Sequence, residues 1–163
     1  MISFSLSRIN DNAPYDVWQH RNEFRFCTES GIHYNISFEE DEPIGGCGTY
    51  QFIIGRQEHS HSGHDSKVRA TILSILDEFF VSNLNVLLYI CDTYDGREGM
   101  RNRLFLSWFS EYTQSDRFTI RTADTQIENE HIYAAIIVEN RNPYIGSILE
   151  EFDDYSQTLE DKP

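Results

Sequence analysis

The sequence predicts an α+β fold on a single mixed β-sheet: an N-terminal antiparallel meander, a strand–helix–strand crossover, a helix, a hairpin and a C-terminal helix, with helices packed on the sheet. Three observations predict this class. Residues 33–40 alternate between apolar and polar side chains, as a half-buried strand does. Residues 68–80 place apolar side chains at helical spacing. Residues 86–91 are apolar throughout, as a buried central strand is.

The N-terminal third predicts short strands separated by turns. Ile2, Phe4 and Leu6 alternate with serines, which indicates a short first strand. Gly31 can adopt the positive φ of a turn, so the apolar segments on either side of it predict a hairpin. The expected order is a strand at 2–6, a turn at 10–14, strands at 23–28 and 33–40, an acidic and then glycine-rich loop at 41–48, and a strand at 49–56.

The remaining elements alternate between strands and helices. A helix should follow the polar segment 57–65 and connect two parallel strands by a right-handed crossover. Asp95 and Glu98 have the spacing of a capping box, which predicts a helix from about 95 to 113. Asn142 and Pro143 predict the start of the last helix. We expect strands at 118–122 and 132–138, and fraying after Asp153 that leaves an acidic tail at about 156–163.

Length and cysteine content predict a single globular domain over residues 1–163 in a reducing compartment. A chain of 163 residues can bury enough apolar surface to fold without disulfides or metal. The three cysteines form no CxxC pair, which favours a cytoplasmic location. The start MISFSLSRIN does not have the pattern of a signal peptide, and no apolar segment is long enough to cross a membrane. We therefore expect no membrane partner.

The net charge of −14 is the strongest feature of the composition. It argues against nonspecific binding of nucleic acid, because such binding depends on Lys and Arg neutralising phosphates. It is compatible with a basic protein partner, a bound cation, or simply good solubility. The acidic residues are concentrated at 39–42 and at 150–161. These two segments are candidate contacts for a basic partner.

A second candidate site lies at one edge of the predicted sheet. Asp92, Asp95, Arg97 and Arg101 follow directly after the apolar strand 86–91, and ligands often bind at this end of strands in open sheets. The crossover should bring the polar loop 57–65 to the same edge. That loop carries three histidines, which are candidate metal ligands together with Asp92: His59, His61 and His64.

Each of these patterns also has a purely structural interpretation. The histidines can belong to a solvated polar loop, and Asp95 and Glu98 to helix capping, with Asp92 paired to Arg97 or Arg101. The order of strand and acids is loosely similar to ribonuclease-H-like nucleases. Those enzymes, however, need an acid inside the first hairpin strand, where this chain has Arg25. An anion bound between the two arginines is a further alternative.

Four segments carry a resemblance to a known family: GIHYNISF, GTYQFIIGR, DSKVRATILSILDEFF and LLYICDTYDGREGMRNRLFLSWF. Over about Phe24 to Phe109 the chain resembles a family of small proteins of unknown function, found mainly in Bacteroidota. The resemblance implies a bacterial cytoplasmic protein. It implies no activity, cofactor or catalytic residue.

Two functions follow as predictions. The first is a non-enzymatic, acidic protein-interaction module without a cofactor, with toxin-neutralising or defence-associated binding as one form of it. The alternative is a metal-dependent hydrolase or phosphodiesterase, in which Asp92 and Asp95 hold a divalent ion and the arginines steady an anionic substrate.

Overall fold

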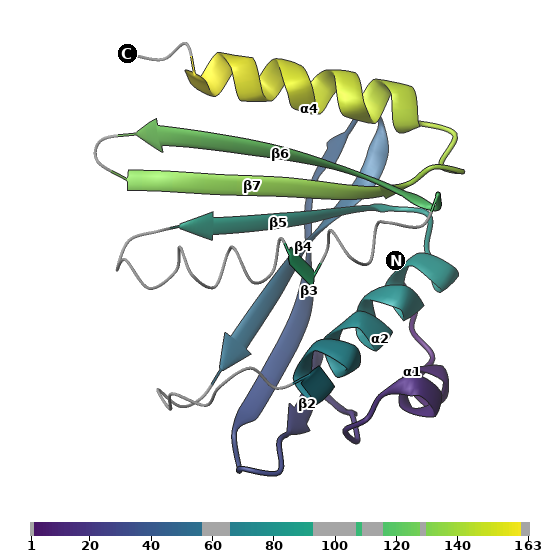
Figure 1. The fold of residues 1–163 in the computed structure, drawn as a ribbon. Coiled ribbons are helices and arrows are strands. Elements are labelled where there is room, and N and C mark those ends of the chain that lie inside the picture. Colours follow the sequence, from purple (N-terminus) through teal and green to yellow (C-terminus); the bar gives the residue numbers. More distant parts are fainter. Residues whose placement is uncertain (1, 57–65, 93–106, 109–115, 128–129, 161–163) are drawn as a thin grey trace. The chain divides into compact units, whose positions relative to one another are not determined.

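The computed structural model of the chain describes residues 2–56, 66–92, 107–108, 116–127 and 130–160. These residues form three helices and one open seven-stranded mixed sheet with the strand order β1-β2-β3-β4-β5-β7-β6 (Figure 1). Within this sheet β4 and β5 are parallel and the other neighbours are antiparallel. The predicted α+β class and the parallel crossover strands are therefore confirmed.

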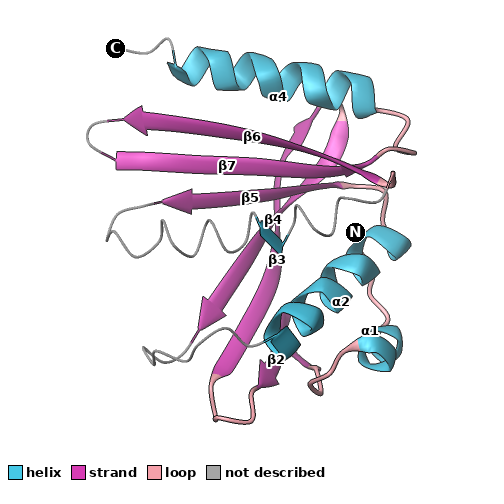
Figure 2. Ribbon diagram, viewed as in Figure 1, coloured by secondary structure: helices cyan, strands magenta, loops and turns pink. Residues whose placement is uncertain are grey.

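Helices and strands are distinguished by colour in Figure 2. In chain order the described elements are α1 (Leu6–Asn12), β1 (Trp18–His20), β2 (Glu23–Cys27), β3 (His33–Ile44), β4 (Cys47–Arg56), α2 (Ser66–Ser82), β5 (Val86–Asp92), β6 (Phe118–Ile127), β7 (Glu130–Glu139) and α4 (Ile145–Glu160).

The chain divides into two compact units. Unit 1 comprises Met1–Glu39 and Phe52–Leu84, and unit 2 comprises Glu40–Gln51 and Asn85–Pro163. The long strands β3 and β4 therefore contribute residues to both units. A single domain over residues 1–163 stays a prediction.

Unit 1 has a core rich in phenylalanine. The rings of Phe38 and Phe79 are stacked with their centroids 5.1 Å apart, and Phe79 meets Phe80 edge to face. Apolar side chains at helical spacing along α2 confirm the predicted helix, which buries Val68, Ile72, Ile75, Leu76, Phe79 and Phe80. Aromatic pairs in these geometries contribute beyond their buried area.

The predicted strand at residues 2–6 is wrong. The chain instead forms α1, which begins after Ser5, whose hydroxyl accepts the N–H of Arg8. This N-cap provides a partner for a backbone donor that a new helix would otherwise leave unsatisfied. Ile9 is then buried and anchors the helix. Residues 2–5 before α1 belong to no helix or strand, and Ser5 serves as the helix cap rather than as one face of a strand.

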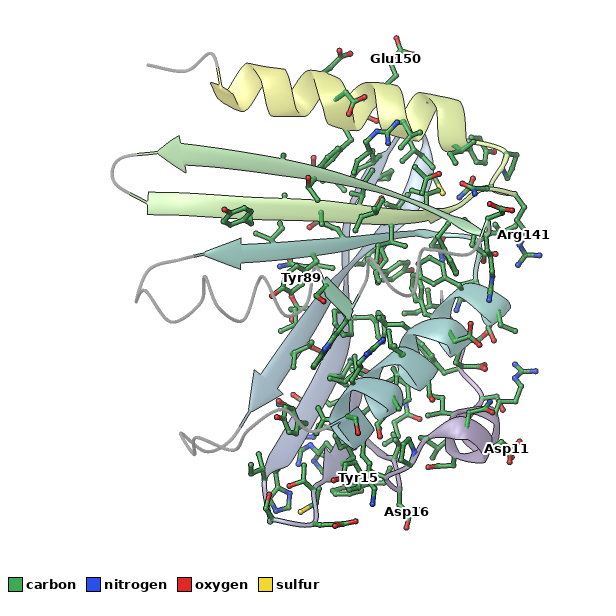
Figure 3. All side chains as sticks on the ribbon, in the orientation of Figure 1. Asp11, Tyr15, Asp16, Tyr89, Arg141 and Glu150 are labelled. Atoms are coloured by element: carbon green, nitrogen blue, oxygen red, sulfur yellow. The ribbon has the colours of Figure 1, made fainter. Side chains whose placement is uncertain are left out.

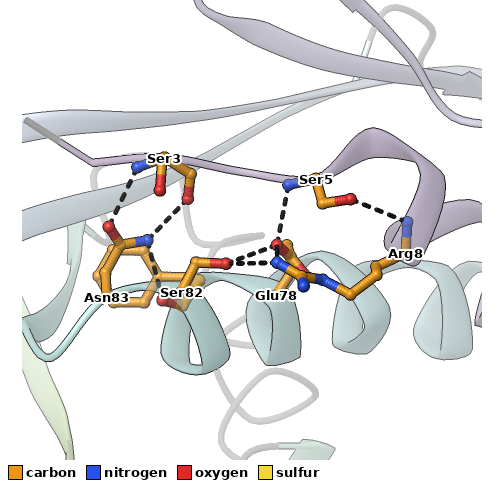
Figure 4. A network of polar contacts seen from close by, with 7 residues as sticks. Ser3, Ser5, Arg8, Glu78, Ser82 and Asn83 are labelled. Carbon is orange, nitrogen blue, oxygen red and sulfur yellow. Dashed lines mark hydrogen bonds and ion pairs between the residues drawn. The ribbon is translucent and has the colours of Figure 1, made fainter.

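A buried glutamate fastens this N-terminal segment to α2 (Figure 4). Glu78 is 4% exposed, and its carboxylate accepts hydrogen bonds from the backbone N–H of Ser5, the guanidinium of Arg8 and the hydroxyl of Ser82. Burial by itself raises the pKa of Glu78, but these hydrogen bonds outweigh burial and hold it below the ordinary value of 4.5. Asn83 adds a second connection through both backbone polar groups of Ser3.

Unit 2 has a separate core between its strands and α4. Ile148 and Phe152 of the helix are buried against Val86 of β5 and Val138 of β7. The other buried members are Cys47, Leu88, Ala123 and Ile136. β5 pairs with β7 from Leu87 opposite Ile137 to Asp92 opposite Ile132, which confirms the predicted central position of the apolar run. The run is buried from Val86 to Leu88, but Ile90 is 41% exposed, so the predicted burial of the whole strand is wrong at that residue.

The predicted loop at 41–48 is wrong, because only Gly45 and Gly46 form the turn between β3 and β4. Both residues have positive φ, +60° and +79°, as a tight hairpin turn requires. The acidic residues before the turn belong to β3 and the residues after it to β4. Pairing of the two strands therefore overrides the weak strand propensity of the acidic residues.

The β6–β7 hairpin and α4 are longer than predicted, and one short strand was not predicted. β6 and β7 pair without interruption from Phe118 opposite Glu139 to Ile127 opposite Glu130, so most of the expected connection is strand. α4 continues to Glu160, so the predicted fraying after Asp153 is wrong and residues 156–160 of the expected tail are helical. The three-residue edge strand β1 was not predicted, because it is too short to show a periodicity. The helix predicted at 95–113 lies almost entirely outside the described residues.

Replacing Gly45 should destabilise the protein more than replacing Gly46. An added Cβ at Gly45 would lie 2.4 Å from the backbone nitrogen of Ile148, whereas one at Gly46 would have no atom within 4 Å. Both positions have positive φ, so Gly45→Ala and Gly46→Ala carry similar conformational strain. We expect Gly45→Ala to lower the free energy of unfolding by about 1–3 kcal/mol more than Gly46→Ala, measured by urea unfolding. Equal losses would show that the turn is not packed against α4.

Glu78→Gln should remove a pH-dependent part of the stability. Because the folded protein lowers the pKa of Glu78, its contribution is complete above 4.5 and is lost as the pH falls through the lowered value. We expect the variant to be less stable than the native protein by about 2 kcal/mol at neutral pH. The difference should shrink in acid, as measured by urea unfolding from about pH 7 to pH 3.5. A stability difference that stays constant over this pH range would show that the hydrogen bonds to Glu78 do not lower its pKa.

Candidate interaction surface

Of the seven residues predicted for the site at the sheet edge, the structure describes only one. Asp92 is the last residue of β5, opposite Ile132 of β7. The six other predicted site residues lie outside the described residues: His59, His61, His64, Asp95, Arg97 and Arg101. Whether these side chains meet at one edge of the sheet stays a prediction.

The described part of the chain contains no group of three His, Cys, Asp or Glu side chains that could hold a metal ion. The histidine loop is not in that part, so this finding does not test it. Within the same part, no helix is long and apolar enough to cross a membrane.

The negative charge of the chain is distributed unequally between the two units. Unit 2 contains 18 of the 27 acidic residues and seven of the 13 basic residues, a formal charge of −11. Unit 1 contains the other nine acidic and six basic residues, a formal charge of −3. Any electrostatic attraction for a basic partner therefore comes mainly from unit 2.

Strand β3 carries the first acidic group of unit 2. Glu40 and Glu42 are exposed and Asp41 is partly exposed. Glu40 lies close enough to act on Tyr50, which is 9% exposed in β4. Burial raises the pKa of Tyr50, and the negative charge of Glu40 raises it further. The tyrosine therefore stays neutral beside this acidic group.

Helix α4 carries the second acidic group on its outer face. Its inner face is apolar, with Ile148 and Phe152 buried. The two residues before Phe152 and the two residues after it are acidic and exposed: Glu150, Glu151, Asp153 and Asp154. Figure 3 shows Glu150 projecting from α4 away from β6 and β7. Acidic side chains three and four positions apart repel each other on a helix, and α4 has no basic residue in its last turn to offset them.

The turn at Gly45 connects the two acidic groups. Its backbone N–H donates to the carboxylate of Glu151, and its carbonyl accepts the hydroxyl of Ser147 at 2.8 Å. Glu42 is three residues from the turn, or about 10 Å along an extended strand. The acidic segments, more than 100 residues apart in sequence, therefore lie near each other in unit 2. We call the two groups together the acidic surface and define it by Glu40, Asp41, Glu42, Glu150, Glu151, Asp153 and Asp154, of which Asp41 points to the opposite face of β3 from Glu40 and Glu42.

The buried carboxylate of unit 2, Glu139, is paired with arginines, unlike the exposed acidic residues. Glu139 is 2% exposed, and its carboxylate accepts hydrogen bonds from Arg117 and Arg141, with Nε to Oε2 distances of 3.3 and 2.9 Å. A buried carboxylate requires such partners. None of the ion pairs that the described residues form involves Glu40, Glu42, Glu150 or Asp153. Arg117 and Arg141 therefore bind the buried Glu139. The carboxylates of Glu40, Glu42, Glu150 and Asp153 are exposed to solvent.

Comparison with known proteins gives one result. Residues 64–154, more than half of the chain, match the model of a family described as "Family of unknown function (DUF6169)". The chain belongs to this family. No curated protein and no solved structure matches the chain.

The DUF6169 match differs in extent from the resemblance expected from the sequence. It begins at His64 and continues to Asp154, so the expected fading after Phe109 is wrong. The match includes α2, β5, β6, β7 and the acidic part of α4. It includes neither the acidic residues of β3 nor His59 and His61. The Bacteroidota origin stays a prediction.

Neutralising part of the acidic surface should stabilise the protein at low salt. Glu150→Gln with Asp153→Asn removes two like charges that lie one turn apart on α4, so the thermal midpoint should rise slightly. At about 0.5 M salt the rise should vanish, because the charges are then screened over a few ångströms. Glu29→Gln is the control, since Glu29 is paired with Lys67 in unit 1 and its replacement should bring no rise. A midpoint that falls in the double variant would show that these carboxylates are needed for folding.

Proposed function

We propose that this protein is a non-enzymatic interaction module that binds a basic protein partner through the acidic surface of unit 2. The observation that carries the proposal is the position of the charge. Unit 2 has a formal charge of −11, and its acidic side chains on α4 are exposed on the face opposite the core. Such a surface attracts a basic partner over a distance and speeds the encounter.

Solubility alone does not require acidic residues to be clustered on one face of a helix. Net charge keeps a protein soluble wherever it lies on the surface. Here four acidic residues follow each other within five positions of one helix, where they repel each other. A fold selected only for solubility gains nothing from such crowding. A dense acidic helix face is better matched to a surface that carries several arginines or lysines.

The proposal includes the cellular setting that the sequence indicated. We place the protein in the bacterial cytoplasm, and the absence of a disulfide at Cys27 and Cys47, the two cysteines whose side chains the structure describes, is in keeping with a reducing compartment. A toxin-neutralising or defence-associated role is the form we favour. An acidic protein of this size can cover the basic surface by which a toxin binds nucleic acid.

Isolation of the protein at low salt from cells that produce it tests the proposal. We expect one basic protein to accompany it in a fixed ratio, measured by quantitative mass spectrometry, and to be released as the salt concentration rises. Glu150→Gln with Asp153→Asn should reduce the retained partner strongly, because both charges belong to the acidic surface.

The matched control is Asp11→Asn with Asp16→Asn. It removes the same net charge from exposed positions of unit 1, both visible in Figure 3. This variant should retain the partner. Equal loss from both double variants would mean that only total charge matters, and the absence of any partner in a fixed ratio would also overturn the proposal.

A further inference from the structure

Unit 1 brings a cysteine and a histidine together on one face of its sheet. Cys27 of β2 lies directly opposite His33 of β3, and the distance from Sγ to Nε2 is 3.8 Å. His33 is exposed and Cys27 is partly exposed. Neighbouring Phe26 and Tyr34 point to the other face, where their rings are stacked 5.1 Å apart. The pair is therefore accessible and lies outside the phenylalanine core.

The geometry points to a zinc half-site, and we propose that a second copy of the chain completes it. Zinc binds cysteine sulfur at about 2.3 Å and histidine nitrogen at about 2.0–2.1 Å in a tetrahedron. Two such ligands around one ion lie about 3.6 Å apart at the tetrahedral angle and about 3.8 Å apart at an angle near 120°. The observed separation of 3.8 Å falls within this range without movement of the backbone.

A rigid turn holds the two residues in place. The backbone N–H of Thr28 donates to the carbonyl of Ile32, and the N–H of Ile32 donates to the hydroxyl of Thr28. Gly31 has a φ of +86° and donates its N–H to the carbonyl of Thr28. Glu29 also forms an exposed ion pair with Lys67 of α2, which adds little to the hydrogen bonds of the turn itself. Ligands on such a fixed hairpin are preorganised for metal binding.

A second copy is the partner that the surroundings favour. Two ligands do not fill a zinc site, and the described residues offer no third His, Cys, Asp or Glu to this pair. Cys27 and His33 from each of two chains supply the four ligands of a Cys2His2 site. Unit 1 has a formal charge of only −3, so two copies repel each other less there than through unit 2. Trp18 is 42% exposed and lies on the same face of the sheet, because it pairs with Arg25, two residues before Cys27. In the proposed dimer the second copy would bury part of this ring.

Zinc binding at this site should release protons. Each Cys27 thiol loses its proton to solvent as the sulfur binds the ion as thiolate, and each His33 binds through a neutral nitrogen. Two chains therefore take up one Zn²⁺ and release two thiol protons, with no change of oxidation state. Binding should weaken as the pH falls.

Titration of the chelator-stripped full chain with Zn²⁺ and Co²⁺, in a non-thiol reductant, tests the inference. We expect one ion per two chains, a metal-dependent dimer by light scattering, and the Co²⁺ absorption of a tetrahedral site with thiolate ligands. Cys27→Ala and His33→Ala should each abolish the dimer and the thiolate absorption. His20→Ala is the control, since His20 is exposed on the same face and should not be needed.

Four results would overturn the inference. The first is one ion per chain with no dimer. The second is a dimer that survives chelation, which would indicate a disulfide. The third is binding that is lost in His61→Ala but kept in Cys27→Ala, which would assign the metal to the histidine loop. The fourth is no binding by a native protein whose unfolding shows it to be folded.

Discussion

The turn at Gly45 and Gly46 is the constraint on which the arrangement of this protein depends. Only residues that tolerate positive φ can join β3 to β4 in two positions, and only a residue without a Cβ can approach the backbone of Ile148 so closely. The turn lets β3 and β4 continue as long paired strands, parts of which belong to each unit. It also fixes where α4 lies against unit 2, through Ser147, Ile148 and Glu151.

The carboxylates of this chain fall into two groups, buried and exposed. Glu78 and Glu139 are buried, and each is satisfied by arginine and by other donors or a second arginine. These carboxylates serve folding, because an unpaired buried charge is strongly destabilising. Among the exposed acids of β3 and α4, Glu151 accepts the N–H of Gly45 and so serves the fold as well, whereas Glu40, Glu42, Glu150 and Asp153 form none of the ion pairs of the described residues, and the acids on α4 repel one another. This contrast separates the charge that folding needs from the charge that remains for a partner.

The two proposals use different parts of the molecule and different chemistry. The acidic surface of unit 2 acts through long-range electrostatics, which are sensitive to salt. The Cys27–His33 pair of unit 1 acts through short coordination bonds, which are sensitive to pH and to chelators. Because they share no residue, failure of one leaves the other standing. A dimer held by zinc would present two acidic surfaces, which strengthens binding to a partner with repeated basic sites.

The sequence by itself determined the α+β class, helix α2, the central strand β5 and its parallel partner β4. Helix α2 rests on a long apolar periodicity, β5 on an unbroken apolar run, and the parallel pairing on the handedness of the crossover. It did not determine α1, since a single serine cap and one buried isoleucine decide between helix and strand there. Residues 41–48 were equally ambiguous, because acidic and glycine-rich composition favours a loop unless a partner strand pairs with it. Only the tertiary structure decided that β3 continues to Ile44 and that the turn after its acidic residues contacts Glu151 of α4, and only it placed Cys27 opposite His33. Strand register and the packing of a turn on a distant helix arise from contacts between residues far apart in sequence, and local patterns do not encode them.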